Sequence, residues 1–151
     1  MAPGPAETPA LQLLADDAED LKVISAALQD AVCTIGDVHF EKAARRLTVA
    51  MNRFRWEAPG ARGGQRVRSA LQLGGVLSLQ AKRLRQGAPK AILSLLAVSF
   101  EAGEAPGGVI SLAFAGGGEL RAEVECIDAV LADVSRPWPT RNRPAHDISG
   151  S

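Results

Sequence analysis

A change in the spacing of the apolar residues within 107–134 constrains the fold of this chain more than any other feature. Apolar residues alternate with small or charged ones on both sides of the glycine run 116–118, which is the period of a β-strand. After Cys126 the apolar residues fall at i, i+3, i+4 and i+7, the period of a helix: Ile127, Val130, Leu131 and Val134. The segment therefore predicts a hairpin whose last strand leads into a C-terminal helix.

The N-terminal part of the chain predicts a second helix. Asp16 stands before an apolar stripe with Glu19 three residues on, which is the spacing of a reciprocal helix cap, and the stripe continues to about Ala31. Residues 11–15 are apolar and predict a short strand or a packed lead-in. Residues 1–10 are rich in Pro and Ala and contain no basic residue, which predicts a disordered leader and not a secretory signal.

Between the two helices the sequence predicts six or seven strands joined by turns. Their expected ranges are 35–42, 46–56, 66–73, 76–84, 91–100 and the two strands that flank the glycine run. The apolar segment 91–100 also fits a short buried helix. The apolar residues of 46–56 change parity after Met51, which predicts a β-bulge near Asn52–Arg53. Gly74–Gly75 fits either a tight hairpin turn or a kink in a longer strand.

This order of elements predicts an α+β fold in which a curled antiparallel sheet has one helix at each end. The strand connections are short, so an antiparallel meander needs no crossover helix. A curled sheet closed by a helix is the architecture of pleckstrin-homology-like barrels or rolls, and an open antiparallel sheet with both helices on one face is the alternative. We expect a single domain over 11–147 and a disordered end at 148–151.

The basic residues are concentrated in the middle of the chain, although its net charge is zero. If the strands that flank the glycine-rich loop 57–65 form a hairpin, the simplest register places Arg55 opposite Arg66. Arg53 then lies opposite Arg68, with all four arginines on one exposed face. Like charges in such positions repel, so the guanidinium groups are predicted to bind an acidic protein or a phosphate-bearing ligand. Nucleic acid is disfavoured, because the chain is neutral and no exposed aromatic residues are interleaved with the arginines.

Three alternatives to a basic binding face remain. The arginines could form ion pairs within the chain, with acids of the flanking segments: Asp16, Asp17, Asp20, Glu123 and Glu125. Asp37, His39 and Glu41 alternate along one predicted strand, so they could hold a metal ion for an enzyme, although such a set is more often a solvated surface. A structural or assembly protein, such as a homodimer through a strand edge, is the third. No catalytic motif occurs, so the sequence favours a non-enzymatic binding module without a cofactor.

The two cysteines and the hydropathy pattern indicate in which cellular compartment the protein is expected. Cys33 and Cys126 lie among apolar residues, which predicts two buried free thiols in a reducing cytoplasm, with Cys126 facing inward beside Val124. No apolar run approaches the ~18 residues that a membrane-spanning helix requires, so no membrane segment is predicted.

Five segments of the chain together resemble a known family: LKVISAALQDAV, NRFRWE, AILSLLAVSFEA, GGGELRAEVECIDAVLADV and PWPTRNRPAHD. They are similar to small bacterial proteins, mainly alphaproteobacterial, that are grouped as a domain of unknown function, the 2948 family. The resemblance extends from about Leu11 to Asp147, and it implies a single-domain cytoplasmic protein. It implies no activity, cofactor or site residue.

Overall fold

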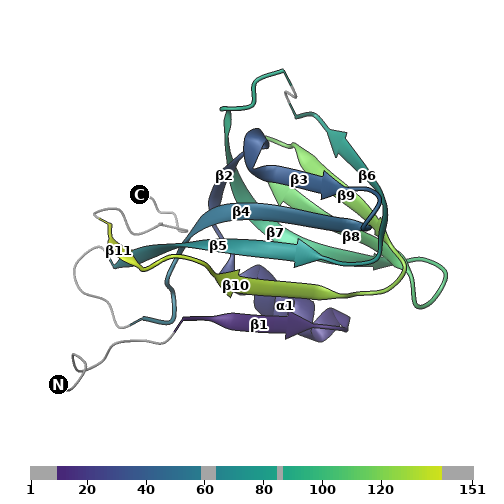
Figure 1. Ribbon diagram of the computed structural model, residues 1–151, viewed down its shortest axis with the longest axis horizontal. Helices are drawn as coiled ribbons and strands as arrows, with labels where there is room; N and C mark the ends of the chain where they lie inside the picture. The colour runs from purple at the N-terminus through teal and green to yellow at the C-terminus, as the bar shows by residue number, and fades with distance from the viewer. Residues whose placement is uncertain (1–9, 59–63, 85–86, 141–151) are drawn as a thin grey trace.

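The computed structural model describes residues 10–58, 64–84 and 87–140, which Figure 1 shows as a curled sheet with one α-helix. The helix is α1 (Ala18–Ala27), and a single turn of 3-10 helix, η1 (Ile35–Asp37), precedes the third strand. The eleven strands are β1 (Gln12–Ala15), β2 (Val32–Thr34), β3 (Val38–Glu41), β4 (Arg46–Phe54), β5 (Gln65–Leu73), β6 (Val76–Lys82), β7 (Ile92–Ala102), β8 (Gly108–Phe114), β9 (Glu119–Val124), β10 (Ala129–Asp133) and β11 (Trp138–Pro139).

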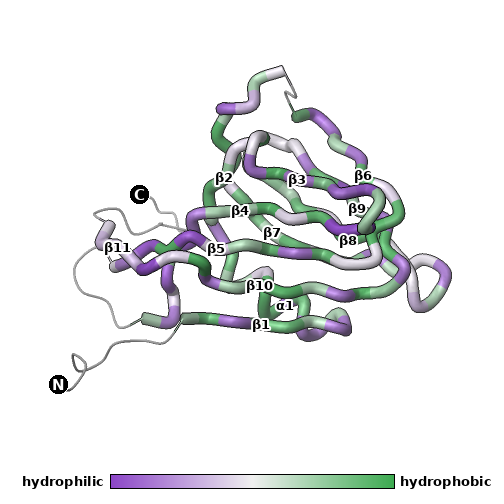
Figure 2. The backbone as a smooth tube through the Cα atoms, in the orientation of Figure 1, coloured by the Kyte–Doolittle hydropathy of each residue, from purple (hydrophilic) through white to green (hydrophobic). Residues whose placement is uncertain are grey.

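The sheet has two halves that enclose one apolar core. One half contains β1, β10, β5, β4 and β3, and the other contains β7, β8, β9 and β6; β2 lies between β4 and β7 and joins them. Apolar residues of both halves form a single buried cluster, and they give the alternating green segments of the strands in Figure 2. The strand path ends at β1 and at β6, so the sheet is open and is not a closed barrel. The predicted α+β class and antiparallel pairing are confirmed, with more strands than predicted.

The predicted C-terminal helix is wrong, because residues 129–133 form strand β10. This strand pairs with β5 on one side and with β1 on the other, so its backbone hydrogen bonds go to two neighbouring strands. Ile127, Ala129 and Leu131 are buried and alternate with Asp128 and Val130, which gives the period of a strand. The predicted helical spacing does not include Ala129, whose small apolar side chain completes the alternation of buried residues at 127, 129 and 131.

The N-terminal helix is confirmed, with different ends. Its cap is Asp17 and not Asp16, since the Asp17 carboxylate accepts a hydrogen bond of 2.8 Å from the backbone N–H of Asp20. The helix ends at Ala27, four residues before the predicted end, because the left-handed backbone of Asp30 turns the chain into β2. Leu21, Ile24 and Leu28 are buried, and α1 packs against β7 and β1.

Two turns decide how the strands are connected. Gly74–Gly75 is neither a hairpin turn nor a kink within one longer strand, because β5 ends at Leu73 and pairs with β10 and β4, whereas the next strand, β6, begins at Val76 and pairs with β9. The chain therefore crosses from one half of the sheet to the other at these glycines, and Gly75 has a left-handed backbone with φ 64°. The glycine run 116–118 is the predicted hairpin turn between β8 and β9. Residues 92–100 of the predicted segment 91–100 lie within strand β7, so the segment is not a buried helix.

The structure also tests the predicted strand 35–42 and the predicted burial of the two cysteines. The predicted strand 35–42 begins with η1, so β3 starts only at Val38. Cys33 is buried, and burial raises the pKa of its thiol to about 12, with a smaller contribution from Asp37. Cys126 is exposed instead of facing inward, since the chain turns between β9 and β10 at this point. Residues 1–9 of the predicted leader and the predicted end 148–151 lie outside the described residues. No helix in the described part has the length and hydropathy needed to cross a membrane.

Candidate functional site

The four arginines predicted to form one exposed face lie on two different faces. In the observed register Arg53 is opposite Val67 and Phe54 is opposite Arg66, one residue away from the predicted pairing. A shift of one residue moves every side chain of a strand to the other face. Arg53 therefore follows Met51 on the inner face, while Arg66 and Arg68 lie on the outer face. The predicted bulge near Asn52–Arg53 is wrong, since this register continues without a shift along β4.

Arg53 is fully buried, and acceptors surround its guanidinium group. Nε and Nη2 each donate to the Asp133 carboxylate at 2.9 Å, and Nη1 and Nη2 donate to the Glu57 carboxylate at 3.0 and 2.7 Å. Nη1 also donates to the carbonyl of Phe54, and the Ser69 hydroxyl lies between Arg53 Nε and Asp133. All five guanidinium N–H groups thus have an acceptor inside the protein. Arg53 joins β4, β5 and β10 and has no donor left for a ligand.

The acids of this network are held in their charged form. Burial by itself would raise the pKa of Asp133, but hydrogen bonds from Arg53, Ser69 and the backbone N–H of Leu11 lower it overall. Burial by itself would also raise the pKa of Glu57, but the hydrogen bond from Arg53 outweighs burial and lowers this pKa overall. On the outer face, burial is again outweighed by hydrogen bonds from Thr34 and Arg68, which lower the pKa of Asp37.

We expect the free energy of unfolding to fall as the pH is lowered through the pKa values of Asp133, Glu57 and Asp37. Their folded-state pKa values lie below the ordinary values of about 4, so their contribution is present at neutral pH and is lost as the pH falls through the folded-state values. Urea unfolding followed by circular dichroism between pH 7 and pH 2.5 measures this loss. The variant Asp133→Asn lacks one of the titrating groups and should lose less stability over the same range. An identical loss in both proteins would contradict the assignment.

The other three arginines make different contacts. Arg68 donates from Nη2 to Asp37 at 2.9 Å and from Nη1 to the Asn52 side chain at 3.0 Å, which ties η1 to β5 across β4. Arg66 lies over the Phe54 ring, 6.0 Å from its centroid, and Arg55 is buried and donates to the side chain of Gln65. The predicted intramolecular pairing is therefore found, but with acids other than the five proposed. An anionic partner at Arg66 and Arg68 stays a prediction. Both residues belong to β5, and Arg66 is opposite Trp138 of β11. Figure 2 shows hydrophilic residues where β5 runs beside β11.

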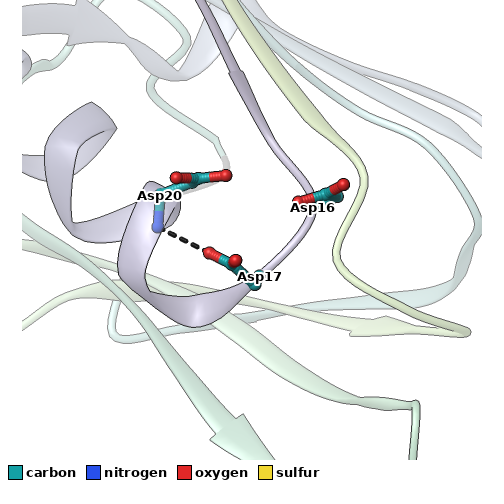
Figure 3. A group of neighbouring side chains, drawn as sticks. All are labelled: Asp16, Asp17 and Asp20. Carbon is teal, nitrogen blue, oxygen red and sulfur yellow. Dashed lines mark hydrogen bonds between the residues drawn. The ribbon is translucent and has the colours of Figure 1, made fainter.

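The three side chains predicted to hold a metal ion, Asp37, His39 and Glu41, do not lie close enough together to share one. The Asp37 carboxylate accepts a hydrogen bond from the backbone N–H of Thr34, the N-cap of η1, and pairs with Arg68. Glu41 pairs with Arg46 at 3.1 Å, and His39 is exposed. Within the described residues the one group of three acidic or metal-ligating side chains close enough to share an ion is at the start of α1: Asp16, Asp17 and Asp20. Figure 3 shows that its hydrogen bond is the helix cap. The charge of Asp17 raises the pKa of Asp20, as expected for exposed acids crowded at a helix N-terminus.

An apolar pocket lies where the two halves of the sheet meet without pairing. Among the described strands, β3 pairs with β4 alone and β6 with β9 alone, so each has one edge without a strand partner. At one end of this seam the backbone N–H of Val76 donates to the carbonyl of Arg45 at 2.9 Å. At the other end Gly36 donates to Pro89 at 2.9 Å.

The pocket has a volume of about 310 Å³, at the lower end of the range of small-molecule sites. Its lining comes from η1 and β3 on one side and from β6, its continuation and β9 on the other: Ile35, Val38, Leu79, Ala81, Leu84 and Leu120. All six side chains are aliphatic. All six residues belong to segments that the sequence predicts as strands. Only the missing pairing between β3 and β6 leaves them open to a ligand, so no local signal could have identified the site.

Comparisons with known proteins identify the family of the chain. The model of a family described as protein of unknown function (DUF2948) matches residues 11–146. Neither the curated proteins nor the solved structures gave a significant match.

Proposed function

This chain belongs to the DUF2948 family, and we propose that it is a non-enzymatic binding module whose seam pocket holds an apolar group of its ligand. The observation that carries the proposal is a pocket of about 310 Å³ beside the unpaired edges of β3 and β6, lined by six aliphatic side chains of which five are partly exposed and Leu120 is buried. Removing apolar surface from water contributes roughly 25 cal/mol per Å², so an apolar group that fills the pocket is stabilised there.

The lining residues support binding more than catalysis. None of the six described lining side chains carries an acid, a base or a nucleophile, and general acid–base or covalent chemistry requires such a group near the substrate. The polar networks of the described residues lie elsewhere: Arg53 with Asp133 and Glu57, and Arg68 with Asp37. The described lining of the pocket therefore offers aliphatic side chains and no reactive side chain.

We expect the substitution Ala81→Phe to abolish binding of an apolar probe. The phenyl ring would occupy the pocket from β6, so the affinity for 1-decanol should fall by at least about tenfold, since the alkyl chain would lose most of its contact area. Isothermal titration calorimetry of the full chain measures this. The matched control is Ala132→Phe on β10, outside the lining, which should keep the wild-type affinity. Failure of the wild-type protein to bind 1-decanol, or equal affinities of all three proteins, would refute the proposal.

Two finer expectations belong with this proposal. A roll of the pleckstrin-homology-like kind is supported by the curled sheet around a single core, although the described residues after β9 form strands where that architecture has a closing helix. A cytoplasmic location is supported by the buried free thiol of Cys33, which a reducing compartment would preserve.

A further inference from the structure

We propose that the outer face of strands β4, β5, β10 and β1 binds the same face of a second copy of this chain, with the two copies related by a two-fold axis. The inference goes beyond the binding function proposed above, because this face contains none of the residues that line the seam pocket. It names an interaction surface and the partner that fits it.

The middle of this face carries no charged side chain. The registers of the four strands place two neighbouring rows of outward side chains there, and each row crosses all four strands. One row is Thr48, Gln72, Val130 and Leu14, and the other is Ala50, Ala70, Ala132 and Gln12. Figure 1 looks onto this face, with α1 and the other half of the sheet behind it, so no described helix or strand covers it. An exposed patch without charge is typical of the centre of a protein–protein interface.

A negative charge lies at one end of the face. Asp128 is exposed and lies opposite Gly74, whose backbone N–H donates to the Asp128 carbonyl at 2.8 Å. Across β5 from Asp128, Arg46 pairs with Glu41 of β3. No ion pair of the described residues includes Asp128. This acidic end therefore has one carboxylate for which the described chain supplies no cation.

A positive charge lies at the other end. The Arg66 guanidinium group donates to the carbonyl of Asn52 at 3.4 Å and lies over the Phe54 ring, but it forms no ion pair with any residue in the described ranges. Burial lowers the pKa of Arg66, and the charge of Asp30 opposes this only in part. A carboxylate brought to this basic end would thus stabilise the guanidinium group.

The acidic end also has a hollow of about 370 Å³. Its lining includes Arg46, Gln72, Gly74 and Asp128. Because Gly74 has no side chain between Arg46 and Asp128, the surface is recessed there. A recess beside a carboxylate fits a long basic side chain, and arginines that enter such recesses contribute strongly to protein–protein binding.

The spacing of the two ends fits a second copy as the partner. Gly74 and Arg66 lie four residues from Ala70 in opposite directions along the chain. A two-fold axis that crosses the strands at Ala70 therefore places the hollow beside Asp128 over the partner subunit's Arg66. The symmetry makes the same contact a second time at the opposite end of the interface. The face is thus complementary in charge to itself when the strands of the two copies run in opposite directions.

The size of the face is sufficient for a specific dimer. Neighbouring strands are about 4.8 Å apart and each residue advances a strand by about 3.3 Å, so four strands over the length from Arg66 to Gly74 cover about 600 Å². Two copies would bury about 1,200 Å² in total, which is the lower end of the range for specific interfaces.

Sedimentation velocity of the full chain between about 5 and 200 µM tests the proposal, since an interface of this size is expected to give a micromolar dimer. Ala70→Arg places two positive charges at the axis, and Asp128→Arg places a positive charge against the partner subunit's Arg66. Each should raise the dissociation constant of the dimer at least about tenfold. The control Glu104→Arg reverses an exposed acid between β7 and β8, outside the face, and should leave the dissociation constant unchanged.

A charge swap gives a result that a folding defect does not imitate. Arg66→Asp should weaken the dimer as Asp128→Arg does, and the double variant Asp128→Arg/Arg66→Asp should recover most of the wild-type affinity, because opposite charges again face each other. Should Arg66→Asp fail to fold, Ala70→Arg and Asp128→Arg still decide the question. A monomer at every concentration, a dimer that both of these variants leave unchanged, or a folded double variant without recovery would overturn the proposal.

Discussion

The variant Asp133→Asn is expected to lose about 3 kcal/mol of unfolding free energy, because it removes a charged partner of a buried guanidinium group. The side chains of Arg53 and Asp133 are 0% and 2% exposed, so water cannot replace the lost carboxylate. The new amide would also place an N–H₂ group next to the guanidinium N–H donors or to the backbone N–H of Leu11. Glu57 remains, which keeps the loss below that of an entirely unpaired charge.

Urea unfolding at pH 7 measures this loss, and two substitutions control it. Asp128→Asn changes an exposed acid just before the same strand and should alter stability by less than about 0.5 kcal/mol. Arg53→Gln should be as costly as Asp133→Asn, whereas all four arginines would tolerate glutamine if they shared an exposed face. A loss below about 1 kcal/mol for both network variants would show that Arg53 is solvated, contrary to the structure.

Phe54→Ala is expected to lower the unfolding free energy by about 3 kcal/mol, since Phe54 is 1% exposed in a cluster separate from the main core. Its ring lies 4.6 Å from that of Trp56 and beneath Arg66. Gly64 completes this cluster with a left-handed backbone of φ 74°, and a Cβ atom there would lie 2.4 Å from the Phe54 ring. Gly64→Ala should therefore cost about 2 kcal/mol, from backbone strain and from this overlap.

A double-mutant cycle tests the contact between these two residues. Once the ring is removed, the new Cβ atom at position 64 no longer meets it, so Phe54→Ala/Gly64→Ala should cost about 1 kcal/mol less than the two single losses together. Phe54→Leu retains most of the apolar volume and should cost less than about 1.5 kcal/mol. Strict additivity in the cycle would show that the glycine does not pack on the ring.

The Arg53 network and the Phe54 cluster both lie away from the seam pocket, so stability variants and binding variants can be interpreted independently. Arg53 and Phe54 are at the end of β4, whereas the seam between β3 and β6 is bounded by Arg45, which precedes the start of β4. Asp133→Asn should thus weaken folding without changing the affinity for 1-decanol under native conditions. The pocket residue Ala81 can be replaced with little expected effect on the Arg53 network for the same reason.

The sequence by itself determined the features that depend on neighbouring residues. Alternation predicted the hairpin of β8 and β9, and caps with apolar spacing predicted α1, because these patterns arise from the local geometry of the backbone. The dense apolar run 91–100 predicted a strand but fitted a short buried helix as well, and β7 is the strand. It also predicted the antiparallel α+β class and the family, which is confirmed over residues 11–146. Where two periods fitted the same residues, as in 127–134, local pattern could not choose between helix and strand.

Only the tertiary structure decided where side chains from distant strands meet. The register of β4 and β5 places Arg53 inside, next to an acid 80 residues away in β10, and no spacing in the sequence indicates that pairing. The seam pocket likewise exists because β3 and β6 do not pair, and their separation follows from the crossing of the chain at Gly74–Gly75. The physical reason is common to both: alternation defines the two faces of a strand, while contacts between strands define which face is buried and which edge stays open.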